Sequence, residues 1–281
     1  MPAPEGSVVV PLDGSKIAER ALPLAARLAR GCDAPVAFVH VLDPDQYDRP
    51  GEPERAERAF RAYAEDLAKR HGIERWDAAV LGGHASEAVL EYAAPARWIC
   101  VASHGRGGFK ALLVGSVADK IVRGAEIPVF FVPVREEQAP LPGPGHPVLV
   151  ALDGSEEAER ALALGREVGQ LLGAAVALVR AYSVPPPVGV EFVAYSPELL
   201  AELEAAASAY LREVAREGEE RYVVQGAPAE AIAEVADRID AGLVVVATRG
   251  LGLARRLILG STTDRLMRSL ARPLLIVPPE A

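Results

Sequence analysis

The stretch VVVPLDGS at residues 8–15 returns 140 positions later as VLVALDGS at residues 148–155. The segment after each copy also repeats, as ERAL at 19–22 and again at 159–162. A long period with only two copies indicates the duplication of a whole domain, because solenoid proteins repeat much shorter units. The chain of 281 residues is therefore predicted to contain two tandem copies of one domain.

Apolar runs of strand length alternate with helical segments along both copies. In the first copy the runs lie near 7–12, 35–41, 76–81, 97–102 and 128–133, and the helical segments near 15–30, 53–71, 85–94 and 115–124. The second copy repeats the runs near 147–152, 175–181, 221–225, 242–247 and 273–277. Runs that are apolar at almost every position are typical of parallel strands covered on both faces. The expected fold class is α/β, with two tandem doubly wound domains of five parallel strands.

The domain boundaries follow from the composition of the connecting segment. We expect domain 1 at 1–135, a linker at 136–146 and domain 2 at 147–281. The linker, EEQAPLPGPGH, is rich in proline and glycine, which predicts a stiff and extended connection.

Charge and composition exclude several functional classes. The net charge of −9 and the pI of about 5.2 argue against nucleic-acid binding, which needs a basic surface. No apolar run approaches the ~20 residues that span a bilayer, and no signal peptide is evident, so we expect a cytoplasmic protein without membrane contact. Cys32 and Cys100 lack metal-ligand or disulfide spacing. We expect no metal site built by the protein, and a buried Cys100.

The first candidate site lies where the first strand of each copy ends. In open parallel sheets, ligands bind beyond the carboxyl ends of the strands. Asp13 and Asp153 follow that strand and precede a helix. A carboxylate there suits a ribose hydroxyl, a base amino group or a water-bound metal better than a phosphate. Ser15 and Ser155 are expected to cap the helices.

The second candidate site follows the fourth strand. The segment ASHG at 102–105 is separated by nine residues from Gly115-Ser116, and ATRG at 247–250 is separated by nine from Gly260-Ser261. Glycine at a helix N-terminus lets backbone N–H groups approach an anion closely. Ordinary N-capping by Ser116 and Ser261 is the alternative. Finding the whole spacing twice favours a phosphate site.

These motifs resemble the ATP-binding branch of the universal stress protein family. Its signature is Gly, two residues, Gly, nine residues, then Gly-Ser or Gly-Thr, and the resemblance covers nearly the whole chain. Both copies depart from it at the first glycine, where Ala102 and Ala247 add a methyl group near the expected ribose. The resemblance implies an adenine nucleotide alpha hydrolase-like fold with two pseudo-two-fold related halves.

The resemblance also implies which residues contact ATP. Asp13 and Asp153, beside Pro11 and Ala151, would face the adenosine, and the backbone at Val41 and Ala181 would read the adenine edge. Gly105, Gly115, Ser116 and Val117 would hold the phosphates in the first site, and Gly250, Gly260, Ser261 and Thr262 in the second. Ala102 and Ala247 would lie beside the ribose. His104 and Arg249 are candidates for weak contacts to the phosphates only. His104 and Arg249 are equally well interpreted as solvated loop residues.

The functional hypothesis is a cytoplasmic, ATP-binding stress-response switch. The sequence shows no P-loop, no nucleophile elbow, and no general base placed to attack phosphate. Slow ATP hydrolysis or autophosphorylation is the most that we expect, with Mg²⁺ or Mn²⁺ held mainly by the phosphates. The alternative is a nucleotide-free dimerising interaction module. An ATP-consuming ligase or transferase is disfavoured, because neither first-strand loop carries a Ser-Gly-Gly motif.

The fifth strand of each copy, at 128–132 and 273–277, is expected at a sheet edge that must be paired. The resemblance implies pairing of the two copies within one chain as a pseudo-dimer. Pairing through the same edges in a homodimer is the further expectation.

Overall fold

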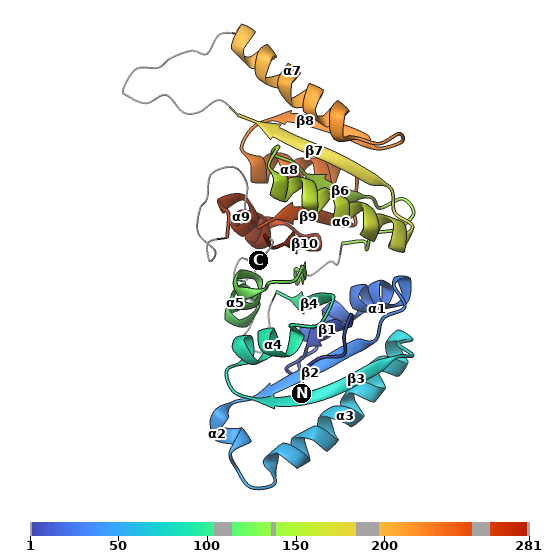
Figure 1. The fold of residues 1–281 in the computed structure, drawn as a ribbon, viewed down its shortest axis with the longest axis vertical. Helices are drawn as coiled ribbons and strands as arrows, with labels where there is room; N and C mark the ends of the chain where they lie inside the picture. Colours follow the sequence, from blue (N-terminus) through green and yellow to red (C-terminus); the bar gives the residue numbers. More distant parts are fainter. Residues whose placement is uncertain (1, 104–113, 136–138, 184–196, 249–258, 280–281) are drawn as a thin grey trace, which may run out of the picture.

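Strands and helices alternate along both halves of the chain (Figure 1). The structure, a computed structural model, describes residues 2–103, 114–135, 139–183, 197–248 and 259–279. The first half contains β1 (Val8–Pro11), the 3₁₀ turn η1 (Ala18–Ala21), α1 (Leu22–Gly31), β2 (Val36–Leu42), α2 (Pro44–Tyr47), α3 (Glu52–His71), β3 (Trp76–Gly82), α4 (Ala85–Ala93), β4 (Trp98–Ala102), α5 (Ser116–Gly124) and β5 (Val129–Val132). The second half contains β6 (Val148–Ala151), α6 (Glu156–Leu172), β7 (Val176–Tyr182), α7 (Pro197–Val214), β8 (Glu220–Gln225), α8 (Pro228–Arg238), β9 (Leu243–Ala247), α9 (Ser261–Ser269) and β10 (Leu274–Val277). All ten predicted strands are confirmed.

The strands of both halves form one sheet of ten strands. Its order is β3-β2-β1-β4-β5-β10-β9-β6-β7-β8. Within each half all neighbouring strands are parallel, and the order reverses direction beside β1 and beside β6. The halves join where β10 pairs with β5 in antiparallel, with Leu275 opposite Phe130. The fold is therefore the predicted pair of doubly wound domains, merged into a continuous and mostly parallel sheet.

This junction changes the expectation for the fifth strands. Neither β5 nor β10 lies at an edge of the whole sheet, because each is paired on both sides. The predicted homodimer through the fifth-strand edges has no free edge to use, so that prediction is wrong for this arrangement. The edges of the sheet are β3 and β8, whose side chains are only partly buried. Coverage on both faces, expected for every strand, does not extend to these two.

Alternating side chains of the strands supply two apolar layers. Val10 faces the layer that α1, α3, α6 and α7 cover, through buried residues such as Leu28 and Leu211. Val9 faces the layer that α4, α5, α8 and α9 cover, through buried residues such as Ile121 and Leu266. Because successive strand residues point to opposite faces, the unbroken apolar runs fill both layers. Cys100 is fully buried, as predicted.

Three connections differ from their predictions. The helix predicted at 15–30 begins as η1 and becomes α-helical at Leu22, just before Pro23. The segment after β2, where no helix is predicted, contains the short helix α2. The linker is not extended over its described part, because the backbone groups of Gly143 and His146 exchange two hydrogen bonds of 3.0 Å. Pro142 of the linker also lies very close to Gly242. A Cβ atom on residue 242 would be 2.4 Å from the backbone of Pro142.

Membrane-spanning helices and metal-binding clusters are the features that bear on the functional classes. In the part of the chain that the structure describes, no helix combines the length and apolarity needed to cross a membrane. Within the same residues, no group of three or more His, Cys, Asp or Glu side chains is arranged to hold a metal ion.

Candidate functional site

A cavity of about 310 Å³ lies at the carboxyl ends of the strands of the second half. The ends of β6, β7 and β9 form one part of its wall, and α8 and α9 form the other. It lies beside β6, where the strand order reverses, which is the expected ligand position in a doubly wound sheet. Its lining residues are Ala151, Leu152, Asp153, Ala158, Val179, Ala181, Pro228, Ile232, Val246, Ala247, Thr248, Gly260, Ser261, Thr262 and Thr263.

A tight turn after the first strand of each half positions the aspartate. Asp153 Oδ1 accepts hydrogen bonds from the backbone N–H of Ser155, at 3.0 Å, and from its hydroxyl, at 2.6 Å. Gly154 between them has a φ of +89°, which a residue with a side chain rarely adopts. The Ser155 hydroxyl in turn accepts from Ala158 N, so its predicted N-cap role is confirmed. The turn places Asp153 in the cavity wall with one carboxylate oxygen already engaged.

The first half repeats the turn with a different helix start. Asp13 Oδ1 accepts from Ser15 N at 2.9 Å, and Gly14 has a φ of +80°. Ser15 Oγ accepts from Ala18 N at 3.1 Å, so the predicted capping bond is present, although it precedes a 3₁₀ turn.

The helices after the fourth strands begin at glycine rather than serine. Gly115 and Gly260 are the N-cap residues of α5 and α9, and neither helix has a side-chain cap in the described structure. The interpretation of Ser116 and Ser261 as ordinary N-caps is therefore wrong, because both lie one position inside the helix. First-turn N–H groups have no acceptor within their own helix, and they carry partial positive charge. At α9 these groups lie beside the cavity.

A backbone hydrogen bond holds each of these helix starts against the end of a strand. Gly260 N donates to Thr248 O at 2.7 Å, and Gly115 N donates to Ser103 O at 2.6 Å. In the second half, Thr263 Oγ1 also donates to Ala247 O at 2.9 Å. The two helix N-termini are thus fixed in equivalent positions relative to β4 and β9.

The structure brings the predicted second site together. The predicted residues that line the cavity are Ala151, Asp153, Ala181, Ala247, Gly260, Ser261 and Thr262. Arg249 and Gly250 lie outside the described residues. The first-site residues occupy the equivalent strand ends and helix start, namely Pro11, Asp13, Val41, Ala102, Gly115, Ser116 and Val117. His104 and Gly105 lie outside the described residues.

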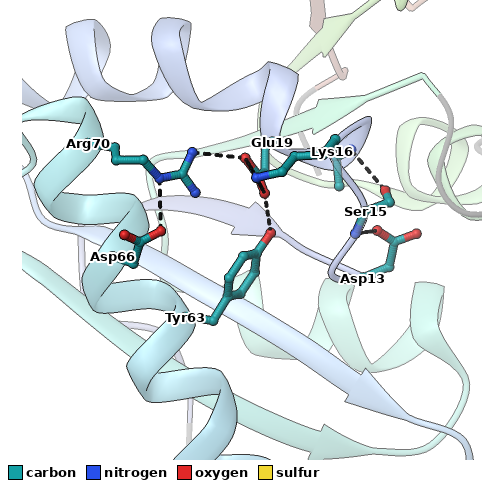
Figure 2. A network of polar contacts seen from close by, with 8 residues as sticks. Asp13, Ser15, Lys16, Glu19, Tyr63, Asp66 and Arg70 are labelled. Carbon is teal, nitrogen blue, oxygen red and sulfur yellow. Dashed lines mark hydrogen bonds and ion pairs between the residues drawn. The ribbon is translucent and has the colours of Figure 1, made fainter.

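A buried carboxylate anchors the turn that carries Asp13 (Figure 2). Glu19 accepts hydrogen bonds from Lys16 at 2.9 Å, Tyr63 at 2.9 Å and Arg70 at 3.2 Å. Burial on its own would raise the pKa of Glu19, but these three donors lower it below its ordinary value of 4.5. The network holds η1, which directly follows the Asp13 turn, against α3, and in this way it stabilises the position of the turn.

The second half has a related but different support. Tyr210 of α7 donates to Glu159 at 3.3 Å, as Tyr63 does to Glu19. Burial, and then the charge of Glu159, raise the pKa of Tyr210 to about 12. The Arg180 guanidinium lies 4.4 Å from the Tyr210 ring centroid and packs against Gly154. An arginine therefore stabilises the second turn from the face opposite the cavity.

Four charged side chains connect α5 with α9 across the junction of the halves. Arg123 donates to Asp119 at 2.8 Å on its own helix and to Asp264 at 2.6 Å on α9. Arg268 donates to both oxygens of Asp264, at 2.9 and 3.3 Å. Asp119 Oδ1 is buried, and no described residue forms a hydrogen bond with it. We name these four residues the junction cluster; its two aspartates are unequally paired.

Sequence reasoning missed part of the cavity wall. Pro228 and Ile232 of α8 close one side, and Thr248 and Thr263 also line the cavity. The helix positions carry no motif that distinguishes them from ordinary core residues. Thr248 carries a usable signal, because it is the counterpart of Ser103 within the repeated segment.

Comparisons with known proteins agree with the duplicated fold. A universal stress protein of Mycobacterium tuberculosis is 28% identical over 292 residues, covering 98% of this chain and 98% of that protein. One of Thermus aquaticus is 37% identical over 134 residues, which is 46% of this chain and 96% of that protein. The crystal structure of a universal stress protein from Archaeoglobus fulgidus has a TM-score of 0.70 at 20% identity, covers 98% of each chain, and shows the fold alone.

The family model bears on each half separately. The model described as the universal stress protein family matches residues 6–133 and, again, residues 145–278. The two matches together cover most of the chain and correspond to the two halves of the sheet. The chain therefore belongs to the universal stress protein family, with two of its domains in tandem.

Proposed function

We propose that the chain binds ATP in the cavity of the second half and acts as a nucleotide-dependent switch within the stress-response role that its family supports. The observation that carries the proposal is the convergence of the predicted site residues on one cavity. Its volume of about 310 Å³ is at the lower end of the range for ligand pockets, ~300–1,000 Å³.

The wall of the cavity suits the parts of a nucleotide. The N-terminus of α9 offers backbone N–H groups and the hydroxyl of Ser261 to the phosphates. Small residues, Ala151, Ala181 and Ala247, leave space for the base and ribose. Asp153 is placed to accept from a ribose hydroxyl or a base amino group. Mg²⁺ would be held mainly by the phosphates, because it usually keeps several waters and takes few protein ligands beside a bound phosphate.

A switch fits this site better than an efficient enzyme. Asp153 is the ionisable residue of the described wall, and its Oδ1 is engaged by Ser155. In the proposed pose Asp153 faces the adenosine, so it is not placed to activate a water molecule beside the phosphates. The shared sheet joins the two halves into one unit. Nucleotide bound at the N-terminus of one helix, α5 or α9, would therefore affect the other helix through the ion pairs of the junction cluster.

Isothermal titration of the nucleotide-stripped protein with ATP and Mg²⁺ tests the proposal. We expect binding with a stoichiometry of one or two per chain. Gly260→Val places a branched side chain at the helix start in the cavity wall and should abolish the second-half site, while Gly115→Val is the matched change in the first half. The absence of binding at millimolar ATP, by calorimetry and by an independent probe, would refute the proposal. The nucleotide-free interaction module would then be the better account.

A further inference from the structure

Ser103 and Thr248 occupy the same position in the two halves. Each follows the strand beside the predicted ribose position, and each accepts a hydrogen bond from the glycine that starts the next helix. Their backbone N–H groups also match, since Ser103 N donates to Val132 O at 2.8 Å and Thr248 N to Val277 O at 2.9 Å. Any difference between their hydroxyl groups must therefore come from the surrounding side chains and backbone.

The difference comes from a proline. Ser103 Oγ accepts a hydrogen bond of 2.9 Å from Val134 N, two residues after β5. The counterpart of Val134, two residues after β10, is Pro279, which has no N–H to donate. No described residue forms a hydrogen bond with Thr248 Oγ1, although the threonine is only 8% exposed. Buried hydroxyl groups without a partner are uncommon, because leaving one unpaired is costly.

The residue that carries the unpaired hydroxyl lies in the cavity wall, although the hydroxyl oxygen itself is covered. Thr248 lines the cavity, and its carbonyl oxygen is bonded to Gly260 N at the start of α9. Helix α9 has nine residues, so it is long enough for its first-turn N–H groups to carry the partial positive charge of a helix N-terminus. A partly positive helix start and an unpaired hydroxyl thus meet at one place.

We propose that Thr248 Oγ1 donates a hydrogen bond to a phosphate oxygen of the nucleotide, and that this contact exists only in the second half. The inference rests on the proposed function. Because Oγ1 is covered in this structure, the contact forms after a rotation about χ1 that exchanges Oγ1 with the methyl group. In the first half the equivalent contact would be less favourable, because Ser103 Oγ would have to break its hydrogen bond with Val134 N in order to reach a phosphate. The two halves therefore differ in phosphate affinity, with the second half binding more tightly.

Thr248→Val tests the inference, because valine keeps the shape and removes only the hydroxyl. Without nucleotide, we expect the variant to melt about 2–4 °C higher, since an unpaired buried hydroxyl has been removed. With Mg²⁺ present, we expect its affinity for ATP to fall by about threefold to tenfold, the range of one hydrogen bond. Binding of adenosine, which has no phosphate, should not change.

Two further variants keep the test specific. Ser103→Ala is the matched control and should lower the melting temperature, because the N–H of Val134 loses its acceptor. Pro279→Val restores the missing N–H, so it should tie up the Thr248 hydroxyl, raise the melting temperature and reduce ATP affinity as Thr248→Val does.

The outcomes separate this inference from the proposed function. Unchanged ATP affinity in Thr248→Val, in a protein whose Gly260→Val variant has lost a binding event, would overturn the role of Thr248 while leaving ATP binding intact. An equal loss for ATP and adenosine would also overturn it, because the contact would then not be to phosphate. A wild-type protein that binds no ATP would refute the proposed function itself.

Discussion

Replacing Asp264 by asparagine should destabilise the protein far more than replacing Asp119, although the two residues are counterparts in the repeat. Asp264 accepts from both arginines of the junction cluster, whereas Asp119 accepts from Arg123 and has one oxygen without a described partner. A hydrogen bond to a charged group contributes roughly 1.5–3 kcal/mol when well buried. The Asp264 side chain is 32% exposed, so screening reduces this contribution.

These values give the expected size of the effect. Asp264→Asn loses charge-assisted bonds to two arginines, and we expect the free energy of unfolding at pH 7 to fall by about 2 kcal/mol. Asp119→Asn keeps an oxygen for Arg123 and places an amide group where an unpaired oxygen stood, so we expect a loss below about 1 kcal/mol. Urea denaturation of the full chain, followed by circular dichroism, measures both values. Equal losses, or a larger loss for Asp119→Asn, would refute the inferred asymmetry.

The dependence on pH provides a control for this prediction. Hydrogen bonds from Arg268, and then Arg123, against the effect of burial, lower the pKa of Asp264 below its ordinary value of 3.8. A lowered pKa contributes stability that is complete above the unfolded value and is lost as pH falls through the folded value. The difference between wild type and Asp264→Asn should therefore persist from pH 7 to about pH 4 and shrink below that. A difference that disappears above pH 5 would mean that the carboxylate is not its source.

Three other predictions follow from buried groups. Glu19→Gln should lower the free energy of unfolding by about 1–3 kcal/mol at pH 7, and the difference should shrink only below pH 4.5, because the folded pKa is lowered; a constant difference down to acid unfolding would contradict this. Gly242→Ala forces its Cβ against the backbone of Pro142 and should cost about 1–3 kcal/mol in urea denaturation, whereas an unchanged midpoint would show that the linker is not held there. Thiol reagents should modify the half-buried Cys32 before Cys100, whose burial raises its pKa, and equal rates in the native protein would argue against that burial.

The features that could be predicted from the sequence are those that short stretches of residues determine. Unbroken apolar runs such as 8–12 specify strands covered on both faces, and the repeat specifies where the second domain begins. The turns at Asp13 and Asp153 were predictable, because Asp-Gly-Ser has few favourable conformations. Exposure of β3 and β8 was not predictable in the same way, because a strand's place at the edge depends on the order of the whole sheet.

The missed features depend on residues far apart in the chain. The unpaired hydroxyl of Thr248 results from a proline 31 positions away, at 279, and becomes visible only when the two halves are superimposed. The asymmetry of the junction cluster depends on which arginine reaches across from α5 to α9. The serine that follows each start glycine looks like a cap in sequence, but Gly115 and Gly260 themselves take the extended N-cap conformation, so the serine lies one position inside the helix.

The antiparallel junction of β5 and β10 also fixes the directions in which the two candidate sites open. The strands of one half run antiparallel to those of the other. The carboxyl ends of the strands in the two halves therefore point in opposite directions along the strand axis. The two candidate sites are therefore entered from opposite directions, although α5 and α9 lie against the same face (Figure 1). Duplication has thus produced a two-ended molecule whose two candidate sites do not share an entrance.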